Sequence, residues 1–277
     1  MAPISLLVFL IAISFGTALF SIPTLESGKY AIYEGSGKIT HTVVEGGITY
    51  TTILEYNSFH REIKILKVES TTIVVNDSKV YSETTTFIYD GNNYSYPESG
   101  KTYEIYGINI SNRLILNGTY AGQYIDLWIP VDLSVGDTVM IGDNYTAEVI
   151  SVSESYKPKY TGYGTRPAIV LEYKTKFGIR DNLVFTIYYD KDTGLLLGII
   201  MTFENGEGQI EISLTDTNIP TTPGGAPGGG EETTPTTPGE TTGESTGLEE
   251  SKILLYAGVG GAIVIIGIAL LYIVRRR

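Results

Sequence analysis

Stretches in which apolar and polar residues alternate recur along residues 22–216, and apolar positions at helical spacing are hard to find there. The stretches are rich in threonine, tyrosine, valine and isoleucine, which favour the pleated, half-buried surface of a strand. Residues 48–56 and 80–89 are two examples. The pattern predicts a mainly β domain of about 11 to 13 strands, paired antiparallel as a sandwich, a curved sheet or a barrel-like sheet.

Turn residues separate these stretches at intervals of roughly 8 to 15 residues, which is the spacing of hairpins. The apolar runs 183–189 and 195–203 flank a turn that places Gly194 at its left-handed position, and this hairpin is predicted to be central and buried on both faces. Residues 97–100 interrupt the pattern and mark a candidate split of the domain. The turn signals are Gly46-Gly47, Asn76-Asp77, Asp90-Gly91-Asn92-Asn93, Asn117-Gly118, Gly142-Asp143-Asn144 and Asn205-Gly206.

Both ends of the chain predict export to a membrane. Residues 1–21 combine an apolar run with small residues, the pattern of a cleaved secretory signal peptide, with an uncleaved anchor as the alternative. Residues 253–274 carry no charge and could span a bilayer as a helix, and the arginines at 275–277 would form a cytoplasmic stop. Residues 217–252 are rich in threonine, proline, glycine and glutamate, which predicts a disordered stalk. Residues 22–216 would then form an extracellular β-rich domain on a single-pass cell-membrane protein.

Charge and composition exclude several classes of function. The formal net charge is −12, and four of the basic residues lie at or beyond Lys252, so the part before them is more acidic still. An acidic surface argues against nucleic-acid binding and against docking flat on anionic lipid. The chain has no cysteine, which excludes thiolate zinc sites, iron–sulfur clusters and thiol catalysis. The composition indicates no cofactor.

Sequons for N-glycosylation are more frequent than chance predicts. In an exported protein this motif marks surface loops, and several of the sequons coincide with the turn signals. We therefore expect a glycoprotein. The candidate acceptors are Asn76, Asn93, Asn109, Asn117 and Asn144.

Two short motifs suggest chemistry, and both are incomplete. Asp192-Thr193-Gly194 matches the D-T-G of aspartic proteases, but it occurs once and at a hairpin turn. Asp190, Asp192 and Gly194 also match the start of a calcium loop, but an EF-hand would need glutamate where Met201 stands. Turn chemistry explains the same residues, so we predict no catalytic residue and no metal site.

Tyrosine is abundant, with 21 residues in the chain. Tyrosine on an exposed sheet face can stack on sugars or contact a partner, because it combines an apolar body with a polar tip. Tyr156, Tyr160 and Tyr163 lie with lysines and glycines in a segment predicted to be an exposed loop. This loop is the candidate contact site.

Several segments resemble the ectodomains of uncharacterised archaeal cell-surface proteins. The segment 28–33 is similar to their "G-D-Y-x-x-Y" first strand, with Lys29 in place of the acidic residue. Residues 128–139 resemble their "W-x-P…L-x-V-G-D-x-V" segment, and 188–196 their "Y-Y-D-x-x-T-G-L-L" hairpin. The resemblance implies an archaeal envelope protein with a β fold, and it carries no catalytic residue.

Three functions remain open. The first is a binding or structural role at the cell surface, in contact with the S-layer, another envelope protein or an extracellular ligand. The second is a carrier or sensor that encloses an apolar ligand in a β cavity, which an internal cavity would favour and a packed interior would exclude. The third is a membrane-tethered hydrolase, which would require His41 or His60 in a cleft beside a carboxylate and a serine.

Overall fold

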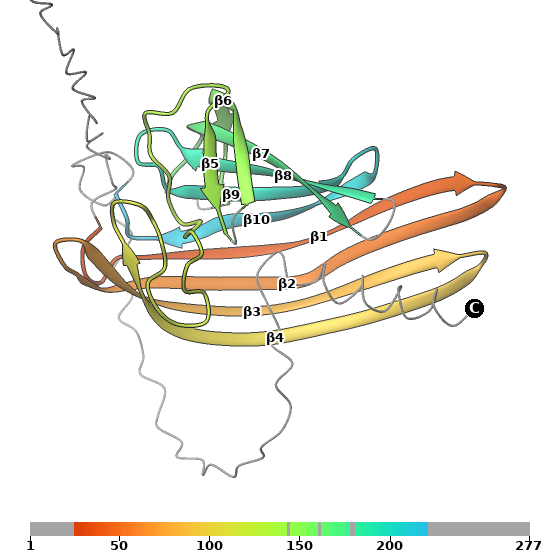
Figure 1. Cartoon of the computed structure of the whole chain (residues 1–277), viewed down its shortest axis with the longest axis horizontal. Helices are drawn as coiled ribbons and strands as arrows, with labels where there is room; N and C mark the ends of the chain where they lie inside the picture. Colours follow the sequence, from red (N-terminus) through yellow and green to blue (C-terminus); the bar gives the residue numbers. More distant parts are fainter. Residues whose placement is uncertain (1–24, 143–144, 160–161, 178–180, 221–277) are drawn as a thin grey trace, which may run out of the picture.

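The computed structural model describes residues 25–142, 145–159, 162–177 and 181–220. These residues form one ten-stranded antiparallel sheet in the order β4-β3-β2-β1-β10-β9-β8-β7-β6-β5, which curls along its length (Figure 1). The strands are β1 (Tyr30–Glu45), β2 (Ile48–Val68), β3 (Thr72–Tyr89), β4 (Asn92–Asn109), β5 (Thr138–Ile141), β6 (Tyr145–Tyr156), β7 (Arg166–Phe177), β8 (Asp181–Asp190), β9 (Leu196–Phe203) and β10 (Glu207–Thr217). The predicted antiparallel β fold is confirmed, as a curved sheet.

The strands are fewer and longer than predicted. Strand β2 alone runs for 21 residues, so several stretches that were expected to be separate strands belong to one. The predicted signal peptide, the span 253–274 and nearly all of the stalk 217–252 lie outside the described residues. The part of the chain that the structure describes contains no helix of the length and hydropathy that crossing a bilayer requires.

Glycine-containing turns join the long strands as the sequence predicted. Gly46 and Gly47 connect β1 to β2 with φ angles of 59° and 81°. Asp90 and Gly91 connect β3 to β4 with φ angles of 47° and 76°. Two consecutive left-handed residues are typical of a turn whose twist matches that of the flanking strands. The Asn76-Asp77 signal was wrong, because both residues lie inside β3.

The predicted interruption at residues 97–100 is also wrong, because β4 runs through it without a register shift. Gly107 and Asn109 direct their backbone groups away from β3, toward the segment that follows β4. The backbone N–H and C=O groups of odd-numbered residues of β4 therefore point to the free edge of the sheet. Pro97 is one of these residues. Proline is tolerated there because the N–H that it lacks would have had no strand partner.

The core lies on one face of the curled sheet, here called the inner face. Directly opposed residues of antiparallel strands point to the same face, so the register assigns every side chain to the inner or the outer face. Strands β8 and β9 form the predicted central hairpin, and all of Leu195 to Ile199 is buried. The prediction that this hairpin is internal is confirmed, but burial on both faces is confirmed only near the turn, because Val184, Thr186, Ile200 and Thr202 on the outer face are half-buried.

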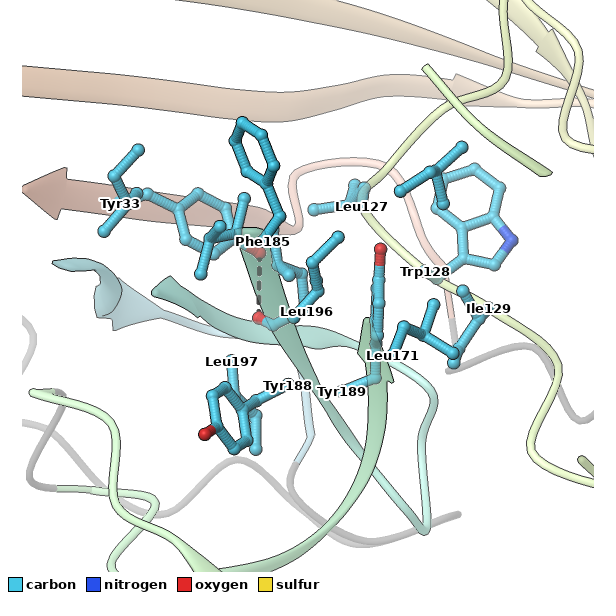
Figure 2. Close-up of a cluster of buried hydrophobic side chains, with 14 of the residues drawn as sticks. Tyr33, Leu127, Trp128, Ile129, Leu171, Phe185, Tyr188, Tyr189, Leu196 and Leu197 are labelled. Carbon is cyan, nitrogen blue, oxygen red and sulfur yellow. Dashed lines mark hydrogen bonds between the residues drawn. The ribbon is translucent and has the colours of Figure 1, made fainter. Parts of the chain in front are cut away.

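The connection between β4 and β5 (residues 110–137) packs on the inner face. Its side chains Leu127, Trp128 and Ile129 are at most 2% exposed and lie beside core residues of β7 to β9 (Figure 2). The backbone is fixed to the β8–β9 hairpin, since Leu196 donates to the Leu127 carbonyl at 2.9 Å. The Tyr33 hydroxyl donates to the Leu196 carbonyl at 3.1 Å, which ties β1 to β9 at the same place (Figure 2).

Candidate functional site

A network of charged side chains lies on the inner face of β2 and β3, against the 110–137 connection. Arg61 forms a two-pronged ion pair with Asp77, with nitrogen–oxygen distances of 2.8 and 3.1 Å. Its remaining terminal nitrogen contacts both carboxylate oxygens of Asp126 in the connection, at 2.9 and 3.0 Å. The Tyr106 hydroxyl donates to Asp77 at 2.7 Å. This network therefore fastens the connection to the sheet.

Burial and charge act against each other in this network. Burial alone would raise the pKa of Asp77, but the Arg61 charge and the hydrogen bonds from Arg61 and Tyr106 outweigh it and hold that pKa below its ordinary value. Nearby, the Lys79 ammonium lies over the rings of Phe59 and Tyr81, at 5.8 and 5.5 Å from their centroids. Burial and the neighbouring Arg61 lower the pKa of Lys79. Since every carboxylate here has a cation beside it, the network has the character of a structural clamp.

Further along the same face, toward the β1–β2 and β3–β4 turns, aromatic and carboxylate side chains gather. We call this group the tyrosine–carboxylate surface. The register places Tyr56 opposite Glu83 and Glu83 opposite Glu98, with Tyr96 opposite Thr85 and Tyr94 opposite Phe87. The members of the surface are Tyr50, Tyr56, Tyr81, Glu83, Phe87, Tyr89, Tyr94, Tyr96 and Glu98.

Its two carboxylates are held by tyrosine hydroxyls. Tyr81 donates to Glu98 at 3.0 Å, and Tyr56 hydrogen-bonds to Glu83. Glu83 is only 6% exposed, and its burial, with the negative charge of Glu98 across the strand pair, raises its pKa. Like charges directly opposed on one face are destabilising, so the fold tolerates an unfavourable pair here. Such a pair can accept hydrogen bonds and, once one carboxyl is protonated, donate one.

The aromatic members of the surface are exposed at the free-edge side. Tyr89, Tyr94 and Tyr96 are 41%, 49% and 51% exposed, which is high for rings of this size. Tyr96 meets Phe87 edge-on at a centroid distance of 6.2 Å, and Tyr89 lies 5.0 Å from Tyr50. These ring contacts limit the rotation of the side chains and leave part of each ring open to a ligand.

Two of the three tyrosines in the predicted contact loop are not exposed. Tyr156 and Tyr163 are 8% and 6% exposed, and Tyr160 lies outside the described residues. The Tyr156 ring stacks on Tyr188 at 4.3 Å and its hydroxyl donates to Glu211 at 3.1 Å. The Tyr163 hydroxyl donates to the backbone carbonyl of Ile219 at 3.2 Å. The exposure prediction was wrong because these tyrosines cover the outer face of the sheet near β10.

The two histidines do not form a catalytic triad in the described part of the chain. His41 Nδ1 lies 2.6 Å from Asp181, a buried residue of β8. His60 lies 3.5 Å from Glu34 at the surface. In the regions that the structure covers, no serine hydroxyl is hydrogen-bonded to either ring, so the nucleophile required for the hydrolase hypothesis is missing there.

The D-T-G motif is a turn stabilised by arginine. Asp190 is fully buried, and its carboxylate accepts from the backbone N–H groups of Asp192 and Thr193 at 2.9 and 2.8 Å. Arg166 donates to Asp190 at 2.7 Å and to Asp192 at 2.8 Å. Both carboxylates are thus engaged, and residues 191–193 form the turn that the sequence predicted. Across the described ranges, no group of three histidines, aspartates or glutamates is arranged to hold a metal ion.

The predicted glycosylation sites differ in exposure. Asn93 and Asn117 are exposed, Asn76 and Asn109 are half-buried, and Asn144 lies outside the described residues. The side-chain oxygen of Asn109 accepts a hydrogen bond from the backbone N–H of Ser111 at 2.9 Å. The side-chain oxygen of Asn117 accepts one from the backbone N–H of Gly107 at 2.6 Å. The side-chain oxygen of Asn76 is buried within β3. The side-chain oxygen of Asn93 accepts from the exposed Ser95 hydroxyl of its own sequon at 3.2 Å rather than from a backbone N–H, so Asn93 has the best access for a transferase among these acceptors.

We expect Asn93→Gln to reduce the mass of the protein from its source organism by one glycan. Asn76→Gln should leave that mass unchanged, because the side chain of Asn76 is packed within β3. Intact-protein mass spectrometry distinguishes the two variants. An unchanged mass for the Asn93 variant, or a reduced mass for the Asn76 variant, would contradict the assignment.

The tyrosine–carboxylate surface was missed in the sequence, although a signal for it exists. The two-residue turn Asp90-Gly91 fixes the register of β3 and β4. Counting seven residues back from Asp90 and seven forward from Gly91 reaches Glu83 and Glu98, which are partners in the structure. Counting three residues in each direction pairs Phe87 with Tyr94 in the same way.

Comparisons with known proteins assign no family. No family model matches the chain, and no curated protein sequence matches it. A candidate lipoprotein from Parabacteroides distasonis ATCC 8503 matches with a TM-score of 0.34 and 12% identity, over 72% of this chain and 98% of that one. The hypothetical protein CT021 from Chlamydia trachomatis matches with a TM-score of 0.29 and 10% identity, over 79% and 96% of the two chains. Scores this low carry no argument about function, and the archaeal resemblance remains a prediction.

Proposed function

We propose that this is a cell-surface binding protein that contacts an envelope component or an extracellular ligand through the tyrosine–carboxylate surface. In this proposal, residues 253–274 anchor the chain in the membrane and the β domain stands outside on its stalk. The observation that supports the proposed surface is the clustering of Tyr89, Tyr94 and Tyr96, all more than 40% exposed, on one face at one end of the sheet.

Tyrosine suits a binding surface because it adds a large contact area with few rotatable bonds and a polar tip. Exposed large apolar side chains gathered in one region mark interaction sites more often than scattered ones do. The half-buried carboxylate of Glu98 supplies a polar group beside the rings, with the buried Glu83 opposite it. A mixture of rigid aromatic anchors and a few convergent polar groups is typical of ligand sites.

The carrier hypothesis receives less support. An apolar ligand would need the inner face of β7 to β9, and Leu127, Trp128 and Ile129 of the connection already pack there. The hydrolase hypothesis has a histidine–carboxylate pair in His41 and Asp181, but among the described residues no serine is hydrogen-bonded to that histidine as the mechanism requires.

The test compares two exposed tyrosines on opposite faces of β4. Full-length protein in nanodiscs is mixed with envelope sheets of the source organism, and the fraction that sediments is measured. We expect Tyr96→Ala to weaken binding about tenfold or more, as truncation of an aromatic hot spot does. Tyr103→Ala should leave binding unchanged, because this residue is 64% exposed but lies on the outer face. Equal effects of the two substitutions, or no effect of Tyr96→Ala, would overturn the proposal.

A further inference from the structure

We infer that the tyrosine–carboxylate surface binds a saccharide chain, with tyrosine rings stacking on sugar rings and Glu98 accepting hydrogen bonds from hydroxyl groups. This inference rests on the proposed function and names the chemical class of its ligand. It is carried by two features of the inner face: the spacing of the exposed rings and the orientation of the carboxylate that continues their row.

Tyr94 and Tyr96 are two residues apart on one strand, so they project from the same face about 7 Å apart. Phe87 stands opposite Tyr94 and contacts the Tyr96 ring. Two neighbouring rings with open faces can each cover the apolar C–H face of one sugar in a chain. An isolated aromatic side chain could hold only one.

The carboxylates continue the same row. Glu98 follows Tyr96 by two residues on the inner face, and Glu83 stands opposite it. A carboxylate has about four acceptor positions. Tyr81 occupies one oxygen of Glu98 and fixes its orientation. The acceptor positions that remain suit adjacent hydroxyl groups of a sugar that lies against Tyr96.

Two small side chains lie on the inner face beside the aromatic residues. Thr85 stands directly opposite Tyr96, and Thr52 opposite Phe87. They are 4% and 8% exposed, so neighbouring side chains already cover them. The surface open to a ligand is therefore that of the exposed rings.

Charge narrows the class of ligand. Two carboxylates on an acidic chain disfavour an anion such as a phosphate or a sialylated glycan. A cation is not required either, because the Lys79 ammonium and the Arg61 guanidinium already lie next along this face. The hydroxyl and carboxylate groups are unsuited to an acyl chain, which offers them no hydrogen bond. A ligand that is neutral and rich in hydroxyl groups avoids the repulsion of an anion, needs no positive charge and offers hydrogen bonds that an acyl chain lacks.

The test uses the full-length protein in detergent on an array of neutral and acidic oligosaccharides, followed by calorimetry with the neutral oligosaccharide that binds best. We expect binding to neutral oligosaccharides, weakened about tenfold or more by Tyr96→Ala because stacking on an aromatic side chain is lost. Glu98→Gln should also weaken binding, since a carboxylate accepts stronger hydrogen bonds than an amide. Tyr103→Ala on the outer face is the matched control and should bind like the unmodified protein.

Two results of the array and calorimetry would overturn the inference. One is that no neutral oligosaccharide binds at millimolar concentration. The other is that binding occurs but withstands Tyr96→Ala. Treating the envelope sheets with periodate or with protease separates this inference from the proposed function. If protease abolishes Tyr96-dependent sedimentation and periodate does not, the partner is a protein, so the saccharide inference fails while the proposed binding surface stands. If sedimentation itself is independent of Tyr96, the proposed function fails.

Discussion

Replacing Arg61 by leucine is expected to lower the free energy of unfolding by about 3–5 kcal/mol, because it leaves a buried carboxylate without its cation. Asp77 is 8% exposed and receives two of the hydrogen bonds from Arg61. Asp126 would lose the guanidinium that ties the 110–137 connection to β2. Urea unfolding at neutral pH, followed by tryptophan fluorescence, measures the change, since the one tryptophan, Trp128, lies in this connection.

An exposed ion pair serves as the control for the effect of the buried pair on stability. Lys38 pairs with Glu55 at 3.4 Å, with both side chains around half exposed. Lys38→Leu should change the stability by no more than about 1 kcal/mol, as exposed ion pairs usually do. Changing Arg61 and Asp77 together to leucine should recover part of the loss, because the buried Asp77 carboxylate is then removed with its cation and only the partly exposed Asp126 is left without Arg61. A loss below about 1 kcal/mol for Arg61→Leu alone would mean that this network contributes little to stability.

The loss should also depend on pH, with a sign that follows from Asp77. In the unmodified protein the pKa of Asp77 is lowered, so its contribution is present above the ordinary aspartate pKa and is lost as the pH falls through the folded-state value. Without Arg61, burial would dominate and raise that pKa. The variant would then lose stability as the pH rises from the ordinary value through the raised one. The difference between the two proteins should therefore shrink in acid.

The same network shows where sequence reasoning stops. Asn76-Asp77 has the composition of a turn, and local chemistry alone predicts one. The partner of Asp77 is Arg61, which becomes its neighbour only when β2 and β3 pair. The tyrosines at 156 and 163 were misjudged for the same reason, since their partners lie in β10 and at Ile219. Burial depends on distant partners that a local pattern does not reveal.

Local signals succeeded where a turn requires a particular backbone conformation. Gly46-Gly47 and Asp90-Gly91 form turns because a left-handed backbone suits glycine, and aspartate tolerates it. The turn at Asp90-Gly91 carries more information than its own position. It fixes which residues of β3 and β4 oppose each other, and with them the Glu83–Glu98 pair. The face on which the candidate site lies could not be deduced, because it depends on where the 110–137 connection packs.

Gly194→Ala is the second substitution with a large expected effect, a loss of about 4 kcal/mol in the free energy of unfolding. Gly194 has a φ angle of 72°, which costs an L-residue roughly 1–3 kcal/mol. A Cβ atom at this position would also lie inside contact distance of the Ile129 carbonyl oxygen. That carbonyl cannot move freely, because the Ile129 N–H donates to the Gly194 carbonyl at 3.0 Å. Overpacking of this kind adds about 1–3 kcal/mol.

Gly91→Ala separates the two causes. Gly91 has a φ angle of 76°, close to that of Gly194, but an added Cβ would meet no atom within 4 Å. We expect it to cost only the backbone strain, about 1–2 kcal/mol, in the same urea unfolding measurement. The excess for Gly194→Ala then measures how tightly the connection is held against the β8–β9 hairpin. Equal losses in the two variants would show that the connection yields to the added methyl group, and the hydrogen bonds at Ile129 would then not fix its position.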